Sequence, residues 1–119
     1  MKKTVVIGAS PNATRYSYKA VRKIDKYGHE VVPLGIRKGE INGKEIITEK
    51  PVLTDIDTVT MYVGPQNQGN WIEYIYSLNP KRIIFNPGTE NFDFISEARE
   101  KGIEVLTTCT LILLDSGGF

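Results

Sequence analysis

The amino-acid sequence predicts a single doubly wound α/β domain, in which helices cover both faces of a five-stranded, mainly parallel sheet. Two observations predict this class. Short apolar segments rich in β-branched residues alternate along the chain with segments whose apolar residues recur at helical spacing. This alternation joins neighbouring strands through crossing helices, which makes the strands parallel. The length of 119 residues suits one buried core and is too short for two, so residues 1–119 are expected to form one domain.

Composition excludes several classes of function. The 15 basic residues nearly balance the 14 acidic ones, whereas a nucleic-acid-binding domain carries a basic excess. No apolar run approaches the ~18–20 residues that cross a bilayer, and the apolar part of MKKTVVIGAS is too short for a secretory signal. Cys109 and His29 are the only residues of their types, so an internal disulfide and a metal cluster built from them are excluded. We therefore expect a cytoplasmic domain that binds no nucleic acid, membrane or metal.

The first half of the chain predicts a strand, a helix, a strand and a hairpin. Thr4–Ile7 is a short apolar strand that ends at a glycine. Ser17–Tyr27 has helical periodicity and is followed by Gly28, the residue type that commonly ends a helix. Glu30–Leu34 is the second strand. Asn-Gly within residues 40–45 is a strong hairpin signal, and we expect a small flap that projects from the sheet.

The second half continues the alternation. It predicts three strands, three helices and the breaks between them: strand Thr58–Val63 stopped by Gly64-Pro65, helix Gln66–Leu78, strand Lys81–Phe85, a helix from an Asn91 cap through Lys101, strand Glu104–Leu106 and a short helix Leu111–Leu114. With right-handed crossovers, this order gives a Rossmann-like domain. Ligands of such domains bind beyond the carboxyl ends of the strands, so the loops that follow the strands are the candidate site.

The loop after the first strand is a candidate anion site. The segment VVIGASPNATRYSYKAV begins like a dinucleotide-binding strand, turn and helix, but it keeps only Gly8 of the three expected glycines. Free backbone N–H groups at the start of the helix attract anions. Ser10 and Asn12 add side-chain donors, and Arg15 can bind a phosphate with its two-pronged guanidinium group.

The loop after the second strand favours a ligand with a phosphate on its ribose. An NAD site has an acidic residue there to bind the ribose diol, whereas this chain has Arg37 and Lys38. A basic pair fits the 3′-phosphate of coenzyme A or the 2′-phosphate of NADP. The loops after the third and fourth strands, residues 64–67 and 86–91, place proline beside small or amide residues at the same sheet edge.

Several segments together resemble the small stand-alone coenzyme A-binding domain proteins. That Rossmann-like family is related to the amino-terminal domain of the succinyl-CoA synthetase alpha subunit. The segments that carry the resemblance are VVIGASPNATRYSYKAV, GHEVVPLG, EINGKEI, DTVTMYVGP, FNPGTEN and EAREKGIEVL through Cys109. They span about residues 3–112.

The resemblance implies a set of cofactor-binding residues by position. The phosphate-binding turn would be Gly8, Ala9, Ser10, Pro11, Asn12 and Ala13. Arg37 or Lys38 would contact the adenosine 3′-phosphate. Val63, Gly64 and Pro65 would form a wall beside the adenine and pantetheine, and Asn86, Pro87 and Gly88 would follow the fourth strand at the same edge.

No catalytic constellation emerges from the sequence. His29, which we expect to be exposed, and the pair Asp55 and Asp57 precede strands, at the edge opposite the ligand. Cys109 is at the ligand edge, but its neighbours offer only hydroxyl groups, so we expect an inert, partly buried thiol. Glu90 is interpreted as a charge at a helix start rather than a base.

The sequence therefore favours non-catalytic binding of coenzyme A or an acyl-CoA, a small-molecule nucleotide ligand. One alternative is a sensor or reductase that binds an NADP-type nicotinamide nucleotide. Another is a protein-interaction subunit of a larger acyl-CoA ligase system. The bare strand edges and the tail at residues 115–119 are compatible with a homodimer.

Overall fold

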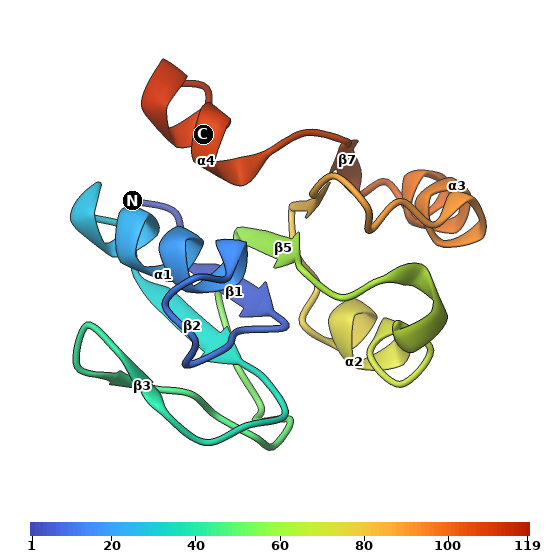
Figure 1. Ribbon diagram of the computed structural model, residues 1–119. Coiled ribbons are helices and arrows are strands. Elements are labelled where there is room, and N and C mark those ends of the chain that lie inside the picture. The colour runs from blue at the N-terminus through green and yellow to red at the C-terminus, as the bar shows by residue number, and fades with distance from the viewer.

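The computed structural model describes residues 1–119 and contains the predicted five-stranded parallel sheet. Its strand order is β2-β1-β5-β6-β7 (Figure 1). The five strands are β1 (Thr4–Ile7), β2 (Val31–Leu34), β5 (Thr58–Met61), β6 (Arg82–Phe85) and β7 (Glu104–Leu106). All four neighbouring pairs are parallel, in registers such as Thr4 opposite Val31 and Thr58 opposite Arg82. The predicted α/β class with a parallel sheet is confirmed.

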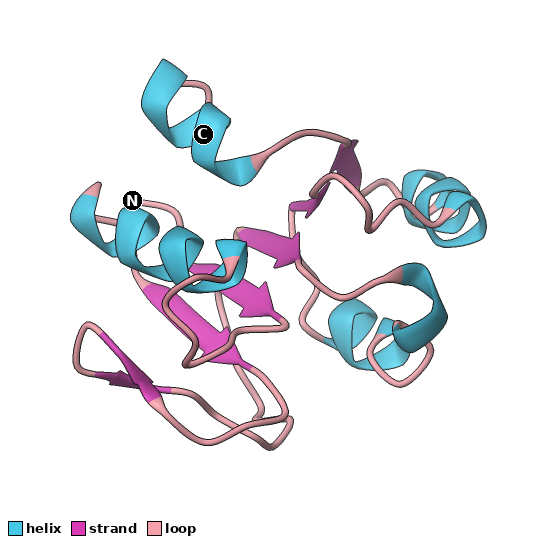
Figure 2. Ribbon diagram, viewed as in Figure 1, coloured by secondary structure: helices cyan, strands magenta, loops and turns pink.

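Helices cover both faces of the sheet (Figure 2). Helices α1 (Tyr16–Lys26) and α4 (Thr110–Ser116) contact each other and pack on one face. Helices α2 (Ile72–Ser77) and α3 (Phe92–Glu100) cover the other face. None of these helices is long and apolar enough to cross a membrane.

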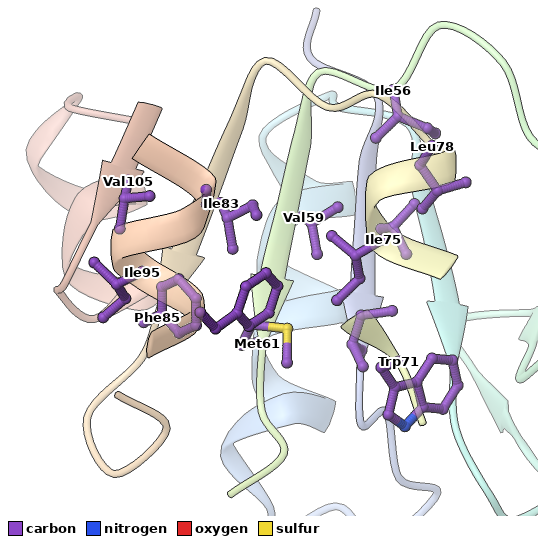
Figure 3. Packing of buried hydrophobic residues seen from close by; sticks show 14 of the residues in the cluster. Ile56, Val59, Met61, Trp71, Ile75, Leu78, Ile83, Phe85, Ile95 and Val105 are labelled. Carbon is purple, nitrogen blue, oxygen red and sulfur yellow. The ribbon is translucent and has the colours of Figure 1, made fainter. Parts of the chain in front are cut away.

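The larger apolar cluster lies between the sheet and helices α2 and α3 (Figure 3). Alternate strand residues such as Val59, Met61, Ile83 and Phe85 point into it, because successive side chains of a strand face opposite sides. The Phe85 and Phe94 rings meet edge to face with centroids 5.3 Å apart, an arrangement that aromatic pairs favour.

The opposite face of β5 and β6 is more polar. Thr60 and Thr110 share a hydroxyl hydrogen bond of 2.7 Å that joins β5 to the start of α4. The amide of Asn86 donates to Thr60 Oγ1 and to the carbonyl of Met61, both at 2.7 Å, and its oxygen accepts from the Thr110 N–H at 2.8 Å. This buried network fixes the carboxyl end of β5 against α4, because buried polar groups are costly when unpaired.

The predicted hairpin is present as a separate two-stranded sheet. Strands β3 (Glu40–Ile41) and β4 (Lys44–Glu45) are joined by Asn42 and Gly43, which both have the positive φ angles of a type I′ turn. Ile41 is fully buried and belongs to the cluster against α1. The expected small hairpin is therefore present, and Ile41 anchors it to the domain.

The predicted helix Gln66–Leu78 was wrong in its first half. The chain instead forms a short 3₁₀ turn, η1 (Pro65–Asn67), and α2 begins only at Ile72. The side chain of Gln68 turns inward and binds backbone carbonyls, and Gly69 follows at the point where the helix would have to continue. The terminal helix, in contrast, extends beyond the predicted Leu111–Leu114 at both ends.

His29 is half-buried at the amino edge of the sheet, and the expectation of an exposed ring was wrong. Its Nδ1 accepts a hydrogen bond of 2.9 Å from the backbone N–H of Lys2. Its ring lies against Phe119, with centroids 4.9 Å apart. Burial lowers the pKa of His29 below its ordinary value, and the positive charges of the amino terminus, Lys2 and Arg82 lower it further, while Asp57 acts in the opposite direction.

This lowered pKa predicts that the fold loses stability in mild acid. As the pH falls below about 6.5, His29 of the unfolded chain takes up a proton before the folded chain does, so the free energy of unfolding decreases. Urea unfolding between pH ~7 and ~5 should show this decrease in the native protein and a smaller one in His29→Asn. Equal pH dependence of the two proteins would contradict the assignment to His29.

Candidate functional site

A cleft of about 720 Å³ opens at the carboxyl ends of β1, β2 and β5. From β1 the chain passes first to β2 on one side and later to β5 on the other, so the strand order reverses at β1. The crossover helices α1 and α2 consequently lie on opposite faces (Figure 1). Ligands of open α/β sheets bind at such a reversal, which makes this cleft the candidate site.

Gly8 forms the turn between β1 and α1. Its φ of +96° lies in the left-handed region, and a Cβ at this position would be 2.9 Å from Cγ2 of Val63. The N–H groups of Gly8 and Ala9 both donate to the carbonyl of Leu34, at 2.9 and 2.8 Å. The turn is therefore held between the ends of β2 and β5.

The turn and helix α1 leave several backbone donors free. Pro11 has no N–H, and the N–H of Asn12 donates to Ser10 Oγ at 3.1 Å. The N–H groups of Ser10 and Ala13 donate to no protein acceptor, and neither do those of the first helical turn, Tyr16, Ser17 and Tyr18. Of the predicted turn, two backbone N–H groups are thus available, and the helix start adds three more.

Ser17 lies in the first turn of α1 and lines the cleft. It is a buried residue, with 5% of its surface exposed. The preceding Arg15 caps the helix without a side-chain hydrogen bond and also lines the cleft. Ser17 was not predicted as a site residue, although it lies only two residues after Arg15, in the first turn of the predicted anion-binding helix.

The cleft carries uncompensated positive charge. Arg15 and Arg37 line it, and no aspartate or glutamate does. Neither arginine takes part in any of the four ion pairs of the structure. Because the chain as a whole has a formal charge of only +1, the excess is local to the cleft, and it favours an anionic ligand.

Close packing of glycines joins the loop after β2 to the β1 turn. A Cβ on Gly35 would overlap the carbonyl oxygen of Ala9, and a Cβ on Gly39 would overlap the ring of Pro11. This contact brings Ile36 and Arg37 into the cleft lining. The close approach of the two loops therefore depends on the absence of side chains at Gly35 and Gly39.

The third wall follows β5. It consists of residues that leave the sheet after Met61 and run to the start of α2: Tyr62, Val63, Gly64, Gln66, Asn67, Gly69, Asn70 and Trp71. Lys50 contacts the end of this wall: its Nζ lies 5.2 Å from the Trp71 ring centroid and donates to the Asn70 carbonyl. The Tyr62 hydroxyl is buried without a partner, and burial raises the pKa of this phenol above its ordinary value.

Eight of the fifteen residues expected to bind the cofactor line this one cleft: Gly8, Ala9, Ser10, Asn12, Arg15, Arg37, Val63 and Gly64. Seven do not: Pro11, Ala13, Lys38, Pro65, Asn86, Pro87 and Gly88. Asn86 is placed apart because its amide is buried and fully engaged with β5 and α4. Nine further residues line the cleft: Ser17, Gly35, Ile36, Tyr62, Gln66, Asn67, Gly69, Asn70 and Trp71. Of these, Gln66 and Asn67 belong to the candidate loop at residues 64–67, whereas residues such as Ser17 and Trp71 were not predicted.

Other chemistry-bearing groups lie outside the cleft. Cys109 is a half-buried free thiol at the cap of α4, and it is not among the lining residues. No group of three or more histidine, cysteine, aspartate or glutamate residues is arranged to hold a metal ion.

Comparison with known families identifies the class of this domain. The family model described as the CoA binding domain matches residues 2–115. The chain therefore belongs to the CoA binding domain family, as its sequence motifs predicted. A comparison with curated proteins gives no match.

Solved structures share the fold over the whole chain. A crystal structure described as that of an uncharacterized protein is 50% identical, has a TM-score of 0.98, and is matched over 100% of this chain and 98% of that one. A hypothetical protein from Pyrococcus horikoshii OT3 has a TM-score of 0.87 at 21% identity, covering 97% of this chain and 82% of that one.

A larger enzyme contains a similar domain. The dinucleotide-forming acetyl-coenzyme A synthetase 1 of Ca. Korarchaeum cryptofilum, solved with phosphate and ADP, has a TM-score of 0.73 at 18% identity. The match covers 90% of this chain but 25% of that one. At this identity the likeness shows a common fold.

The glycine contact between the first two loops predicts a large effect of one methyl group. Gly35→Ala should lower the free energy of unfolding by about 1–3 kcal/mol, because the two buried loop backbones must separate to admit the Cβ. Gly69→Ala is the matched control, since nothing lies within 4 Å of its Cβ position. Urea unfolding should show the control within about 1 kcal/mol of the native protein, and equal losses in both variants would contradict the proposed contact.

Proposed function

We propose that the cleft binds coenzyme A or an acyl-CoA and holds its phosphates against the start of α1. The observation that carries this proposal is the pair of arginines, Arg15 and Arg37, that face the cleft without any acidic partner. Membership of the CoA binding domain family supports the class of ligand. Coenzyme A carries a pyrophosphate and a separate ribose phosphate, which is the charge pattern that two separated arginines would complement.

The free donors suggest how the nucleotide would be oriented. The N–H groups of Ser10, Ala13 and the first turn of α1, together with Arg15, would bind the pyrophosphate. Arg37, on the loop after β2, would bind the 3′-phosphate of the ribose. Ile36, Val63 and Trp71 offer apolar surface for the uncharged parts of the ligand.

We further propose that binding is not accompanied by catalysis. The titratable residues that line the cleft are Arg15, Arg37 and Tyr62. Arginine stays protonated at neutral pH, and burial raises the pKa of the Tyr62 phenol, so none of the three is suited to act as a general base. The domain would therefore sequester, present or sense its ligand, in a cytoplasmic location that remains a prediction from the sequence.

The ligand can be identified with the protein's own fluorescence, because Trp71 is its only tryptophan and it lines the cleft. Titration with coenzyme A or acetyl-CoA should change the Trp71 emission and saturate. Titration with NADP tests the main alternative, a nicotinamide-nucleotide sensor or reductase. No response to millimolar coenzyme A, checked by calorimetry, would refute the proposed function, and tighter binding of NADP would replace it with the alternative.

The role of Arg37 predicts a specific loss. Arg37→Ala should weaken binding of coenzyme A by about tenfold, the value of one charge-assisted contact, and leave binding of 3′-dephospho-coenzyme A nearly unchanged. Lys38→Ala is the matched control, because the neighbouring Lys38 lies outside the cleft lining. Calorimetric titration of the native protein and the two variants with coenzyme A and 3′-dephospho-coenzyme A measures these affinities. An equal loss of coenzyme A affinity in both variants would contradict a specific contact of Arg37, because it would show that only the net charge of the loop matters.

A role as an interaction subunit of an acyl-CoA ligase system, and self-association as a homodimer, remain predictions. Sedimentation at several protein concentrations, with and without coenzyme A, would test self-association directly. A constant monomer mass under all conditions would exclude the homodimer.

A further inference from the structure

Gln68 is fully buried directly behind the third wall of the cleft. None of its surface is exposed, and it is absent from the lining residues, so it would not touch a bound ligand. Full burial of an uncharged amide is tolerated only where its polar atoms find partners. The buried Gln68 amide must therefore find hydrogen-bond partners within the protein.

The Gln68 amide joins two loops through both of its N–H groups and through its oxygen. Its Nε2 donates to the carbonyl of Val63 at 2.9 Å and to the carbonyl of Thr89 at 2.7 Å. Its Oε1 accepts from Nδ2 of Asn91 at 3.1 Å. Val63 belongs to the cleft wall, whereas Thr89 and Asn91 belong to the loop after β6, which contributes no lining residue.

Both partner loops are themselves anchored. Thr89 donates through its hydroxyl to the Asn86 carbonyl at 2.8 Å, and Asn86 holds β5 and the start of α4. Asn91 caps α3 by accepting from the Phe94 N–H at 3.2 Å. Gln68 therefore ties the cleft wall to the rigid part of the domain.

The wall in turn meets the phosphate turn. Cγ2 of Val63 lies 2.9 Å from the position that a Cβ on Gly8 would take, so a shift of Val63 changes the space beside the turn. Gln68 also lies within the segment from Gly64 to Trp71, and its backbone carbonyl accepts from the Trp71 N–H at 2.8 Å. Loss of the amide would free the wall on its buried side.

We propose that Gln68 is the positioning residue of the cleft: its buried amide sets the distance between the wall at Val63–Trp71 and the turn at Gly8, and thereby controls ligand affinity without ligand contact. This inference builds on the proposed binding of coenzyme A. It also gives a structural role to residues 87–91 (PGTEN in the sequence), which lie outside the cleft lining. They would act on the cleft through the hydrogen bonds of Thr89 and Asn91 with Gln68.

The first test removes the amide while keeping the volume. Gln68→Leu should raise the Kd for coenzyme A by about tenfold or more, because the carbonyls of Val63 and Thr89 lose this donor and the wall shifts. Val105→Ala is the control: this buried residue belongs to the larger apolar cluster and lies on the far edge strand β7. Compared at a temperature where both variants are fully folded, the control should bind coenzyme A within about twofold of the native protein.

A second variant covers the case in which Gln68→Leu does not fold. Asn91→Asp keeps the oxygen that caps α3 but replaces the Nδ2 donor to Gln68 with a second acceptor. It should raise the Kd by a few fold. Unchanged affinity in Asn91→Asp and in any folded Gln68→Leu, with native binding intact, would overturn the positioning role and leave the proposed function standing.

A ligand-free measurement separates the two proposals. In ¹H–¹⁵N spectra without coenzyme A, Gln68→Leu or Asn91→Asp should shift the amide signals of Gly8, Gly64 and Asn67, whereas Val105→Ala should not. If native protein bound no coenzyme A but these shifts occurred, the proposed function would fail and the positioning of the wall would stand. If the amide signals of the wall stayed in place, the positioning role would be refuted whatever the ligand.

Discussion

The close approach of three backbones at one edge of the sheet is the constraint on which the rest of the site depends. The ends of β1, β2 and β5 pack so tightly that Gly8 and Gly35 have no room for a side chain. The β1 turn also donates two hydrogen bonds to the end of β2. With its inner donors engaged in this way, the turn leaves only its outer N–H groups and the start of α1 to face the cleft. The packing that stabilises the loops therefore also selects which donors a ligand can reach.

The positive charge of the cleft results from where individual arginines lie, and not from the overall amino-acid composition of the chain. A formal charge of +1 over 119 residues indicates no anionic partner. The ion pairs, however, use lysines together with Arg82, at sites such as Lys23–Asp115 and Lys44–Asp25, and leave Arg15 and Arg37 unpaired. Since exposed charges are screened over about 8–10 Å, what a ligand senses is this local pair and not the balance of the whole chain.

The sequence predicted the sheet because its strands are short, β-branched and bounded by glycine, signals that depend only on neighbouring residues. The donors and arginines of the first two loops were predictable for the same reason. Ser17 and Trp71 were missed because their place in the cleft depends on where two helices on opposite faces begin. The error at Gln66–Leu78 has two causes. Asn67, Gly69 and Asn70 are poor helix formers, a local signal that the prediction overlooked. The other cause is the buried amide of Gln68, which binds carbonyls from two loops. Such long-range partners leave no local pattern in a sequence.

Asn86 and Gln68 illustrate a division between residues that support the cleft from behind and residues that line it. Both belong to polar segments at the ligand edge, where an amide suggests ligand contact. Both are instead buried, with every carbonyl and N–H group of the side chain engaged, so that each binds a strand end on one side and a helix start or loop on the other. A buried amide holds its neighbours in a defined geometry because leaving any of its polar atoms unpaired is costly. The surface amides of Gln66, Asn67 and Asn70 have no such restriction, and they are free to adapt to a ligand that the fixed frame behind them positions.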